Sequence, residues 1–236
     1  MTLGGLSREL TRHKNSRKAV FVAHYFKTGK GEYGEGDVFL GLTVPEMRAI
    51  VKKYRELPLE NVEKLLHNKI HEYRLTALFI LMDKFKKADQ ATRKTYYNFY
   101  LSNTKWINNW DLIDLSARDI VGGWLLTKPK ERKTLYTLAR SKSIWERRIA
   151  MIATFAFLKA GEVKDTLNLA EFLLHDPHDL IHKAVGWLLR EVGKIDPKAQ
   201  VQFLDKHYRV MPRTMLRYAI EKMDRPQRSH YLRHEL

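Results

Sequence analysis

An aromatic residue and a carboxylate stand four residues apart in the stretch INNWDLID, as Trp110 and Asp114. Side chains at this spacing share one face of an α-helix. An indole face attracts a cation through its quadrupole, and a carboxylate stabilises a positive charge that develops on a sugar. The pair therefore suits the departure of a cationic base from a sugar, whereas the neighbouring Asp111 is explained as an acid in the first helical turn.

A purine alkylated at N3 or N7 is such a cationic base. Because it already carries a positive charge, it needs no general acid in order to leave. Hydrolysis of its glycosidic bond then mainly requires a group that stabilises the oxocarbenium-like sugar and positions a water molecule, and one carboxylate can do both. The alternative for Asp114 is a structural hydrogen bond between helices, and the alternative for each tryptophan is core packing.

The elements that must position this pair are helices. Apolar residues recur at intervals of three and four over most of the chain, and no convincing alternating strand pattern is present. Proline and aspartate mark several predicted helix starts, as at Pro45, Pro58 and Asp196 with Pro197. The sequence therefore predicts an all-α fold.

A repeat appears when the long apolar helices are aligned on a small residue in their second turn. Ala77, Ala150, Gly186 and Ala219 occupy this position, and the interval from Ala77 to Ala150 leaves room for a further unit. Asp114 falls where the missing small residue is expected, so one unit would carry a carboxylate there. Spacings of 33 and 36 residues between the last three are typical of helical hairpins that stack as HEAT-like repeats.

The repeat predicts one domain over residues 1–236, a curved α-solenoid of antiparallel HEAT-like repeats, in which residues 1–55 form a less regular N-terminal helical cap. Trp187, Arg190 and Arg148 are predicted to join Trp110 and Asp114 on its concave face, since equivalent positions of stacked repeats line one surface. Basic residues also recur near the starts of the long helices; they are Arg74, Arg147, Arg148, Lys183 and Arg217. These residues predict a basic concave face that binds phosphates, and helix-end solubility is the alternative.

The composition favours a polyanionic partner. Lysine and arginine number 43 against 27 acidic residues, which gives a formal charge of +16, and the pI is about 9.9. An excess this large indicates nucleic acid before a generally basic soluble protein. Cysteine is absent, which excludes disulfides, thiolate metal sites and cysteine nucleophiles. No secretory signal or membrane-length apolar run is visible, so we expect a cytoplasmic protein of the bacterial type, associated with the nucleoid.

Two motifs that suggest other chemistry have simpler explanations. The stretch GKGEYG (residues 29–34) matches a dinucleotide-binding pattern, but a predicted helix precedes it where that pattern needs a strand, so a flexible loop is expected. The histidines of HDPHDLIH surround a predicted helix start, and we interpret them as turn and cap residues. No metal and no organic cofactor are therefore expected, and no lysine is placed as a Schiff-base nucleophile.

The chain resembles the AlkD family of alkylpurine DNA glycosylases, which are built from HEAT-like repeats. The matching stretches are FLGLTVPEMR (39–48), NWDLID (109–114), IWERRIAM (144–151) and IHKAVGWLLREVGK (181–194). The resemblance covers nearly the whole chain at similar length. The chain departs from the family pattern in the loop GKGEYGEGDV, which is longer and acidic, and in the wider spacing of the two tryptophans in KWINNW.

The resemblance implies a role for individual residues. Asp114 corresponds to the catalytic carboxylate, and Trp110 and Trp187 to the aromatic pair that flanks the lesion. Arg148 and Arg190 correspond to groove residues that contact the DNA backbone, and Tyr25 to an N-terminal tyrosine near the DNA. The family is thought to act on a lesion without burying it in a pocket, unlike most glycosylases.

The sequence thus predicts a monomeric, monofunctional DNA glycosylase that removes cationic N3- and N7-alkylated purines, of the 3-methyladenine and 7-methylguanine type, from double-stranded DNA. Asp114, Trp110 and Trp187 are the predicted catalytic residues. The predicted DNA-binding residues are Arg148, Arg190, Tyr25, Arg147 and Lys183. Two alternatives remain: a non-catalytic HEAT-repeat paralogue that recognises distorted or branched DNA, and a HEAT-like scaffold for protein interactions.

Overall fold

The computed structural model describes residues 1–233 of the chain. Every regular element in this range is helical, and the one extended pairing is an isolated parallel β-bridge between Val38 and Ile70. The all-α prediction is confirmed. None of the described helices is both long and apolar enough to cross a membrane. The chain divides into two compact units, residues 1–116 and the residues from 117 onward, and each is described by itself.

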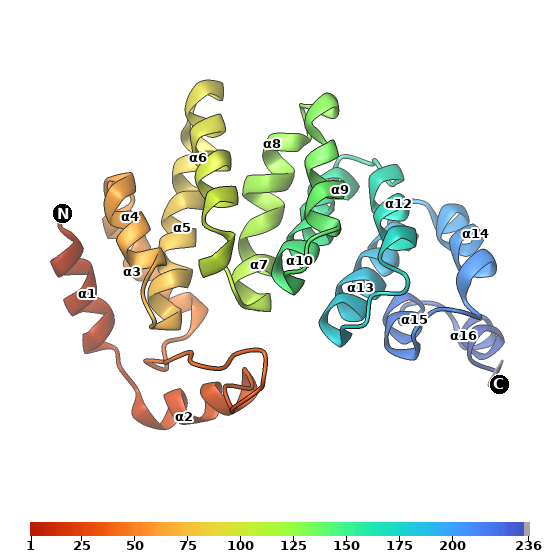
Figure 1. Cartoon of the computed structure of the whole chain (residues 1–236), viewed down its shortest axis with the longest axis horizontal. Helices are drawn as coiled ribbons and strands as arrows, with labels where there is room; N and C mark the ends of the chain where they lie inside the picture. The colour runs from red at the N-terminus through yellow and green to blue at the C-terminus, as the bar shows by residue number, and fades with distance from the viewer. Residues whose placement is uncertain (234–236) are drawn as a thin grey trace. The chain divides into compact units, whose positions relative to one another are not determined.

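The first unit is built around one buried helix (Figure 1). Its helices are α1 (Leu3–Arg12), α2 (Ser16–Tyr25), α3 (Val44–Tyr54), α4 (Leu59–Leu66), α5 (His71–Lys87), α6 (Gln90–Ser102) and the start of α7 (Trp110–Ala117), with a short 3-10 turn at Thr104–Trp106. Helices α3, α4 and α6 all pack against α5. The first eleven residues of α5 are buried on every side, as expected of a helix enclosed by neighbours. Helix α2, in contrast, buries none of its residues.

The segment between α2 and α3 is held by a buried carboxylate at the start of α5. The Glu72 side chain accepts hydrogen bonds from the backbone N–H groups of Leu40, Gly41 and Leu42, at 2.9, 2.7 and 3.3 Å. Gly41 has a φ of +87° and lies so close to Asn15 that a Cβ atom there would meet the carbonyl oxygen at 2.4 Å. Only glycine fits that conformation and that space. The segment is therefore fixed against the end of the helical layer.

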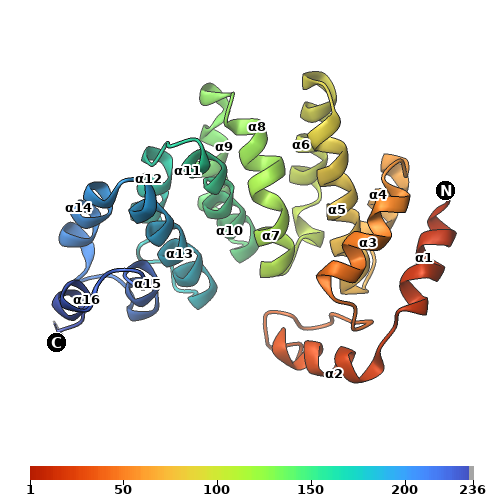
Figure 2. The ribbon, with the colours of Figure 1, turned by 180° about the vertical axis from the view of Figure 1, so that it is seen from behind.

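The second unit repeats one packing arrangement (Figure 2). Its helices are a π-helical turn (Arg118–Gly122), α8 (Gly123–Leu125), α9 (Lys133–Ala139), α10 (Ile144–Ala153), α11 (Phe155–Lys159), α12 (Lys164–Phe172), α13 (Asp179–Ile195), α14 (Pro197–His207), α15 (Arg213–Ala219) and α16 (Arg225–Leu232), with a 3-10 turn at Pro129–Glu131. Helix α10 packs on α13, which packs on α15, while α9, α12 and α14 lie beside this row. Asp196 caps α14 through its side chain, and Pro197 begins that helix, as predicted.

The small repeat position is confirmed, but its assignment in α7 was wrong. Ala77, Ala150 and Ala219 are each the seventh residue of their helix, Gly186 is the eighth, and all four are buried. Asp114 is only the fifth residue of α7 and is half-buried. The fully buried Ala117, eighth in α7, occupies the small position instead. Asp114 therefore stands one turn earlier, at the fourth or fifth position, where the other long helices carry Arg74, Arg147, Arg148, Lys183 and Arg217.

Substitution of Gly186 by alanine tests the close packing of α13 on α15. An added Cβ would lie 2.4 Å from the Met215 carbonyl oxygen and 2.6 Å from the Tyr218 Cβ, so the helices would have to separate. We expect Gly186→Ala to lower the free energy of unfolding by about 1–3 kcal/mol. Gly4→Ala in α1 is the control, because its new Cβ would meet only the Arg8 side chain, at 3.6 Å. Urea unfolding measures the free energy of unfolding of both variants. Equal decreases in the two variants would contradict the close-packing role of Gly186.

Candidate functional site

Trp110 and Asp114 lie on consecutive turns at the start of α7, where the chain leaves the 3-10 turn. The Asn109 carbonyl accepts the first helical hydrogen bond from Ile113, and the Asn109 side chain accepts one from the Trp110 N–H at 2.8 Å. Asn109 itself is completely buried. This buried cap explains the asparagine before the tryptophan and sets where the helix begins. Trp110 and Asp114 are both half-buried, so each retains solvent-accessible surface.

Three aromatic side chains from the first 33 residues surround Trp110. Phe26 stacks on the indole with ring centroids 5.1 Å apart and planes at 26°. Tyr25 meets it edge-on at 6.0 Å and is itself 57% exposed. The indole N–H donates a hydrogen bond to the Tyr33 hydroxyl at 3.2 Å. The structure thus brings together the predicted residues Tyr25 and Trp110, and it adds Phe26 and Tyr33, which sequence reasoning missed.

Asp111 proves to be more than an acid in the first turn, because a buried histidine holds it. The His71 Nε2–H donates to the Asp111 carboxylate at 2.8 Å, and the His71 Nδ1–H donates to Asp37 at 3.1 Å. The Asp37 carboxylate also accepts a hydrogen bond from Arg74 at 2.7 Å. This cluster ties the segment after α2 to the starts of α5 and α7. It therefore anchors the start of the helix that carries Trp110.

The electrostatics of the cluster favour a charged histidine. Burial by itself lowers the pKa of His71, but the carboxylates of Asp111 and Asp37 outweigh it and raise the pKa to about 9. Burial by itself raises the pKa of Asp37. The hydrogen bond from His71 and the charge of Arg74 lower this pKa by more than burial raises it, so it lies below the usual value. Each ring nitrogen of His71 faces a carboxylate oxygen, which fits an imidazolium that donates to both.

The remaining predicted aromatic and basic residues lie in the second unit. Trp187 is half-buried on α13 and contacts Phe155 with ring centroids 5.6 Å apart. Arg190, one turn later, donates a hydrogen bond to Glu221 and lies 3.5 Å from Glu191. Lys183 pairs with Asp179 at 2.6 Å and is 40% exposed. Of the two basic residues, Lys183 has the more accessible charge, and Arg190 would have to leave Glu221 in order to bind a phosphate.

Arg147 and Arg74 each have a structural role that the sequence did not predict. Arg147 donates to the carbonyls of Ser141 and Lys142, both at 3.0 Å, and to the Asp176 carboxylate at 2.6 Å. Arg74 repeats this pattern, with bonds to the carbonyls five and six residues earlier and to Asp37. In each case the guanidinium closes the turn before its long helix. Both guanidinium groups are therefore engaged within the fold, and the DNA contact predicted for Arg147 stays a prediction.

Arg148 is also buried, with 5% of its surface exposed. Its guanidinium donates a hydrogen bond to the Leu180 carbonyl and so connects α10 with the start of α13. The backbone contact that the family resemblance implies for it stays a prediction.

Replacement of Arg147 separates the structural role from a DNA-binding one. Arg147→Ala removes both turn bonds and leaves the Asp176 carboxylate, which is 4% exposed, without its ion-pair partner. We expect a loss of about 3 kcal/mol in the free energy of unfolding. Arg217→Ala, at an exposed position of α15, should change stability by less than about 0.5 kcal/mol. Denaturant titration measures both, and unchanged stability together with weakened DNA binding for Arg147→Ala would restore the phosphate role.

The histidines near α13 serve as caps, as predicted. The His178 Nδ1 atom accepts a hydrogen bond from the Leu180 N–H at 3.1 Å, and His182 bonds to the Asp176 carbonyl. Within residues 1–233 no group of three or more histidine, cysteine, aspartate or glutamate side chains is arranged to hold a metal ion.

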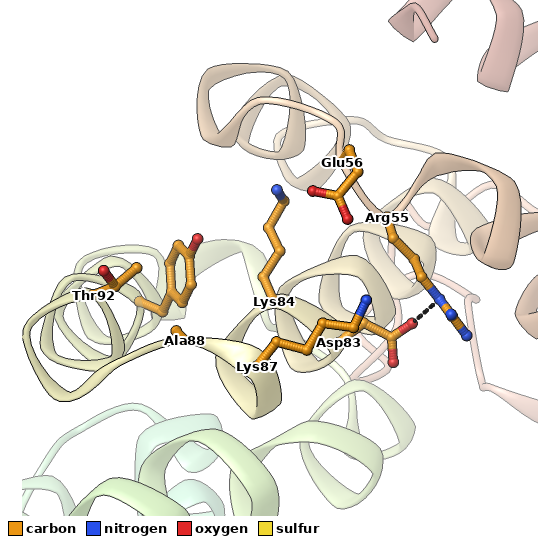
Figure 3. A pocket seen from close by; sticks show the side chains of 8 residues that line it. Arg55, Glu56, Asp83, Lys84, Lys87, Ala88 and Thr92 are labelled. Atoms are coloured by element: carbon orange, nitrogen blue, oxygen red, sulfur yellow. Dashed lines mark ion pairs between the residues drawn. The ribbon is translucent and has the colours of Figure 1, made fainter.

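A separate cavity in the first unit lies where α3 and α5 end and α6 begins (Figure 3). Its walls mix charges of both signs, and Arg55 pairs with Asp83 at 2.8 Å. None of the predicted site residues lines it. It is therefore distinct from the cluster around Trp110, which remains the candidate site of this unit.

Comparisons with known proteins bear on the fold and the family. A solved structure described as a predicted DNA alkylation repair enzyme from Enterococcus faecalis superposes with a TM-score of 0.70, over 90% of this chain and 98% of that one. At 18% sequence identity this similarity concerns the fold. No curated protein matches the chain significantly in sequence. The model of the DNA alkylation repair enzyme family matches residues 6–223, and the chain belongs to that family.

Proposed function

We propose that the protein is a monofunctional DNA glycosylase that hydrolyses the N-glycosidic bond of cationic N3- and N7-alkylated purines in duplex DNA. One observation carries the proposal. Trp110 and Asp114 share a helix face beside the exposed Tyr25, while the adjacent Asp111 is committed to His71. We call the side chains of Trp110, Tyr25 and Phe26 the aromatic wall. Such a reaction needs at least a carboxylate with accessible surface and an aromatic surface next to it.

In the proposed reaction the lesion supplies its own leaving group. The bond between C1′ of the sugar and the purine nitrogen breaks, and its electron pair neutralises the cationic base. The Asp114 carboxylate stabilises the positive charge that develops on the sugar. A water molecule then adds to C1′ and loses a proton, for which Asp114 is the acceptor. The products are the free neutral base and an abasic site.

The aromatic wall favours a charged base over a neutral one. Phe26 covers one face of the Trp110 indole, and Tyr25 meets the ring edge-on. A cationic purine against the accessible part of the indole would gain about 0.5–2 kcal/mol from the ring quadrupole. Normal purines lack both this attraction and the activated leaving group. Selectivity for alkylated bases thus follows from chemistry as well as from fit.

Release of free base from a defined lesion tests the proposal. We expect the wild-type protein to liberate 7-methylguanine from a duplex that contains it, and to leave the unmodified duplex intact. Binding of both duplexes is measured in parallel at low salt, because phosphate contacts weaken steeply as salt rises. Binding without release would favour the non-catalytic DNA-binding alternative. Absence of both would contradict any role on DNA and favour the protein scaffold.

A further inference from the structure

We propose that Tyr33 is a positioning residue that orients the Trp110 indole for its substrate. This inference rests on the proposed function. The carrying observation is the hydrogen bond from the Trp110 Nε1–H to the Tyr33 hydroxyl, at 3.2 Å. Tyr33 belongs to the acidic loop GKGEYGEGDV (residues 29–38), which follows α2. The loop thereby gains a function that its composition does not disclose.

The loop is built to hold Tyr33 in one place. The Gly29 N–H donates to Glu32, and the Gly31 N–H to Glu35, each at 2.8 Å. The two acidic side chains therefore close turns within the loop. The Gly34 N–H donates to the Lys27 carbonyl at 3.1 Å.

Both ends of the loop are anchored beside Trp110. A Cβ atom on Gly34 would lie 2.4 Å from the Phe26 carbonyl oxygen, so the chain on one side of Tyr33 is pressed against the residue that stacks on Trp110. On the other side, Asp37 is held in the buried cluster by His71 and Arg74. Tyr33 therefore sits between two fixed points, and its hydroxyl is not free to follow a mobile indole.

Three contacts then define the indole orientation. Stacking on Phe26 fixes the ring plane, and the edge contact with Tyr25 limits sliding. Neither of these ring contacts is a directional bond to one particular edge of the indole. The hydrogen bond from the pyrrole edge is directional, so it selects the one ring orientation that makes that bond. A near-attack geometry depends on such fixed orientation.

The test compares Tyr33→Phe with Tyr218→Phe. The first removes only the hydroxyl that accepts the indole bond. The second removes a hydroxyl from a partly exposed tyrosine on α15, outside the candidate site. The five tryptophans give five indole N–H signals in a nitrogen-proton correlation spectrum. The Trp110 signal is the one that disappears in Trp110→Phe. Tyr33→Phe should move this signal upfield and speed its exchange with water, and Tyr218→Phe should leave it in place.

The same variants are then assayed for release of 7-methylguanine under single turnover. Tyr33→Phe should slow release by about 3- to 10-fold, the effect of one neutral hydrogen bond, with duplex affinity unchanged. An unmoved indole signal would overturn the inference, and so would a moved signal with an unchanged rate. A parallel loss of affinity would make Tyr33 a DNA contact instead. If the wild type releases no base while the signal still moves, the proposed function fails and Tyr33 is a structural anchor only.

Discussion

Asp114→Asn is expected to abolish most base release while duplex binding survives. The substitution keeps the size of the side chain and removes its charge, so the oxocarbenium-like sugar loses its counter-charge and the water loses its proton acceptor. Removal of one preorganised electrostatic group of this kind lowers a rate by about 100- to 1000-fold. Loss of a negative charge close to phosphates should leave DNA affinity equal or slightly higher. Single-turnover release of 7-methylguanine and a duplex-binding titration measure the two effects separately.

Asp119→Asn is the matched control for this experiment. It makes the same chemical change in the π-helical turn that follows α7 directly, where the Asp119 side chain is 37% exposed and pairs with Arg118. We expect release within about twofold of the wild type, because an exposed ion pair contributes little. Equal losses in the two variants would mean that Asp114 acts through general charge or stability. Full activity of Asp114→Asn would remove it from the reaction altogether.

His71→Ala is expected to destabilise the first unit strongly. The substitution leaves the Asp37 and Asp111 carboxylates buried near each other without the imidazolium that both contact. Removing one partner of a buried ion pair costs about 3–5 kcal/mol. His24→Ala, at an exposed position of α2, should change stability by less than about 0.5 kcal/mol. Urea unfolding followed by circular dichroism compares them, and similar midpoints for the two variants would show that the cluster is not an anchor.

The same cluster predicts how stability depends on pH. The folded-state pKa of His71 is raised to about 9 from an ordinary value of 6.5. The stabilisation is therefore complete below about pH 6.5 and is lost as the pH rises through about 9. Asp37 affects stability at the acid end of the pH scale. Because its folded-state pKa is lowered, its contribution to stability is lost as the pH falls through that pKa. The wild type should lose on the order of 3 kcal/mol across the alkaline window.

His71→Ala supplies the control for this pH dependence. Without the imidazole the variant should show no comparable loss between about pH 6.5 and pH 9, so the two stability curves should approach each other as the pH rises. Parallel curves would assign the alkaline loss to other groups. Base release by the wild type should decline in the same alkaline window, because the cluster anchors the start of α7 beside Trp110.

Local pattern was enough to predict the class of fold and part of the candidate site. Helical periodicity predicted the all-helical chain, because apolar spacing directly reports which residues a helix buries. The small repeat residues were recognisable because Ala150 and Gly186 have the one property, small volume, that close helix packing demands. Trp110 and Asp114 were found because the four-residue spacing defines a helix face whatever the surroundings. The AlkD resemblance supplied their expected roles.

Tertiary contacts decided what pattern could not. Arg147 and Lys183 look alike in sequence, yet Arg147 closes a turn and Lys183 keeps an accessible charge, because only the folded chain places Asp176 within reach of the guanidinium. Asp111 and Asp114 are likewise the same residue type on the same helix, but only the folded chain shows that Asp111 is buried against His71 while Asp114 is half-buried. Tyr33 carried no signal, since its partner lies 77 residues away. The sequence by itself determined the helices and the residue types available for chemistry, whereas long-range packing decided which charged side chains are buried inside the fold and which keep solvent-accessible surface.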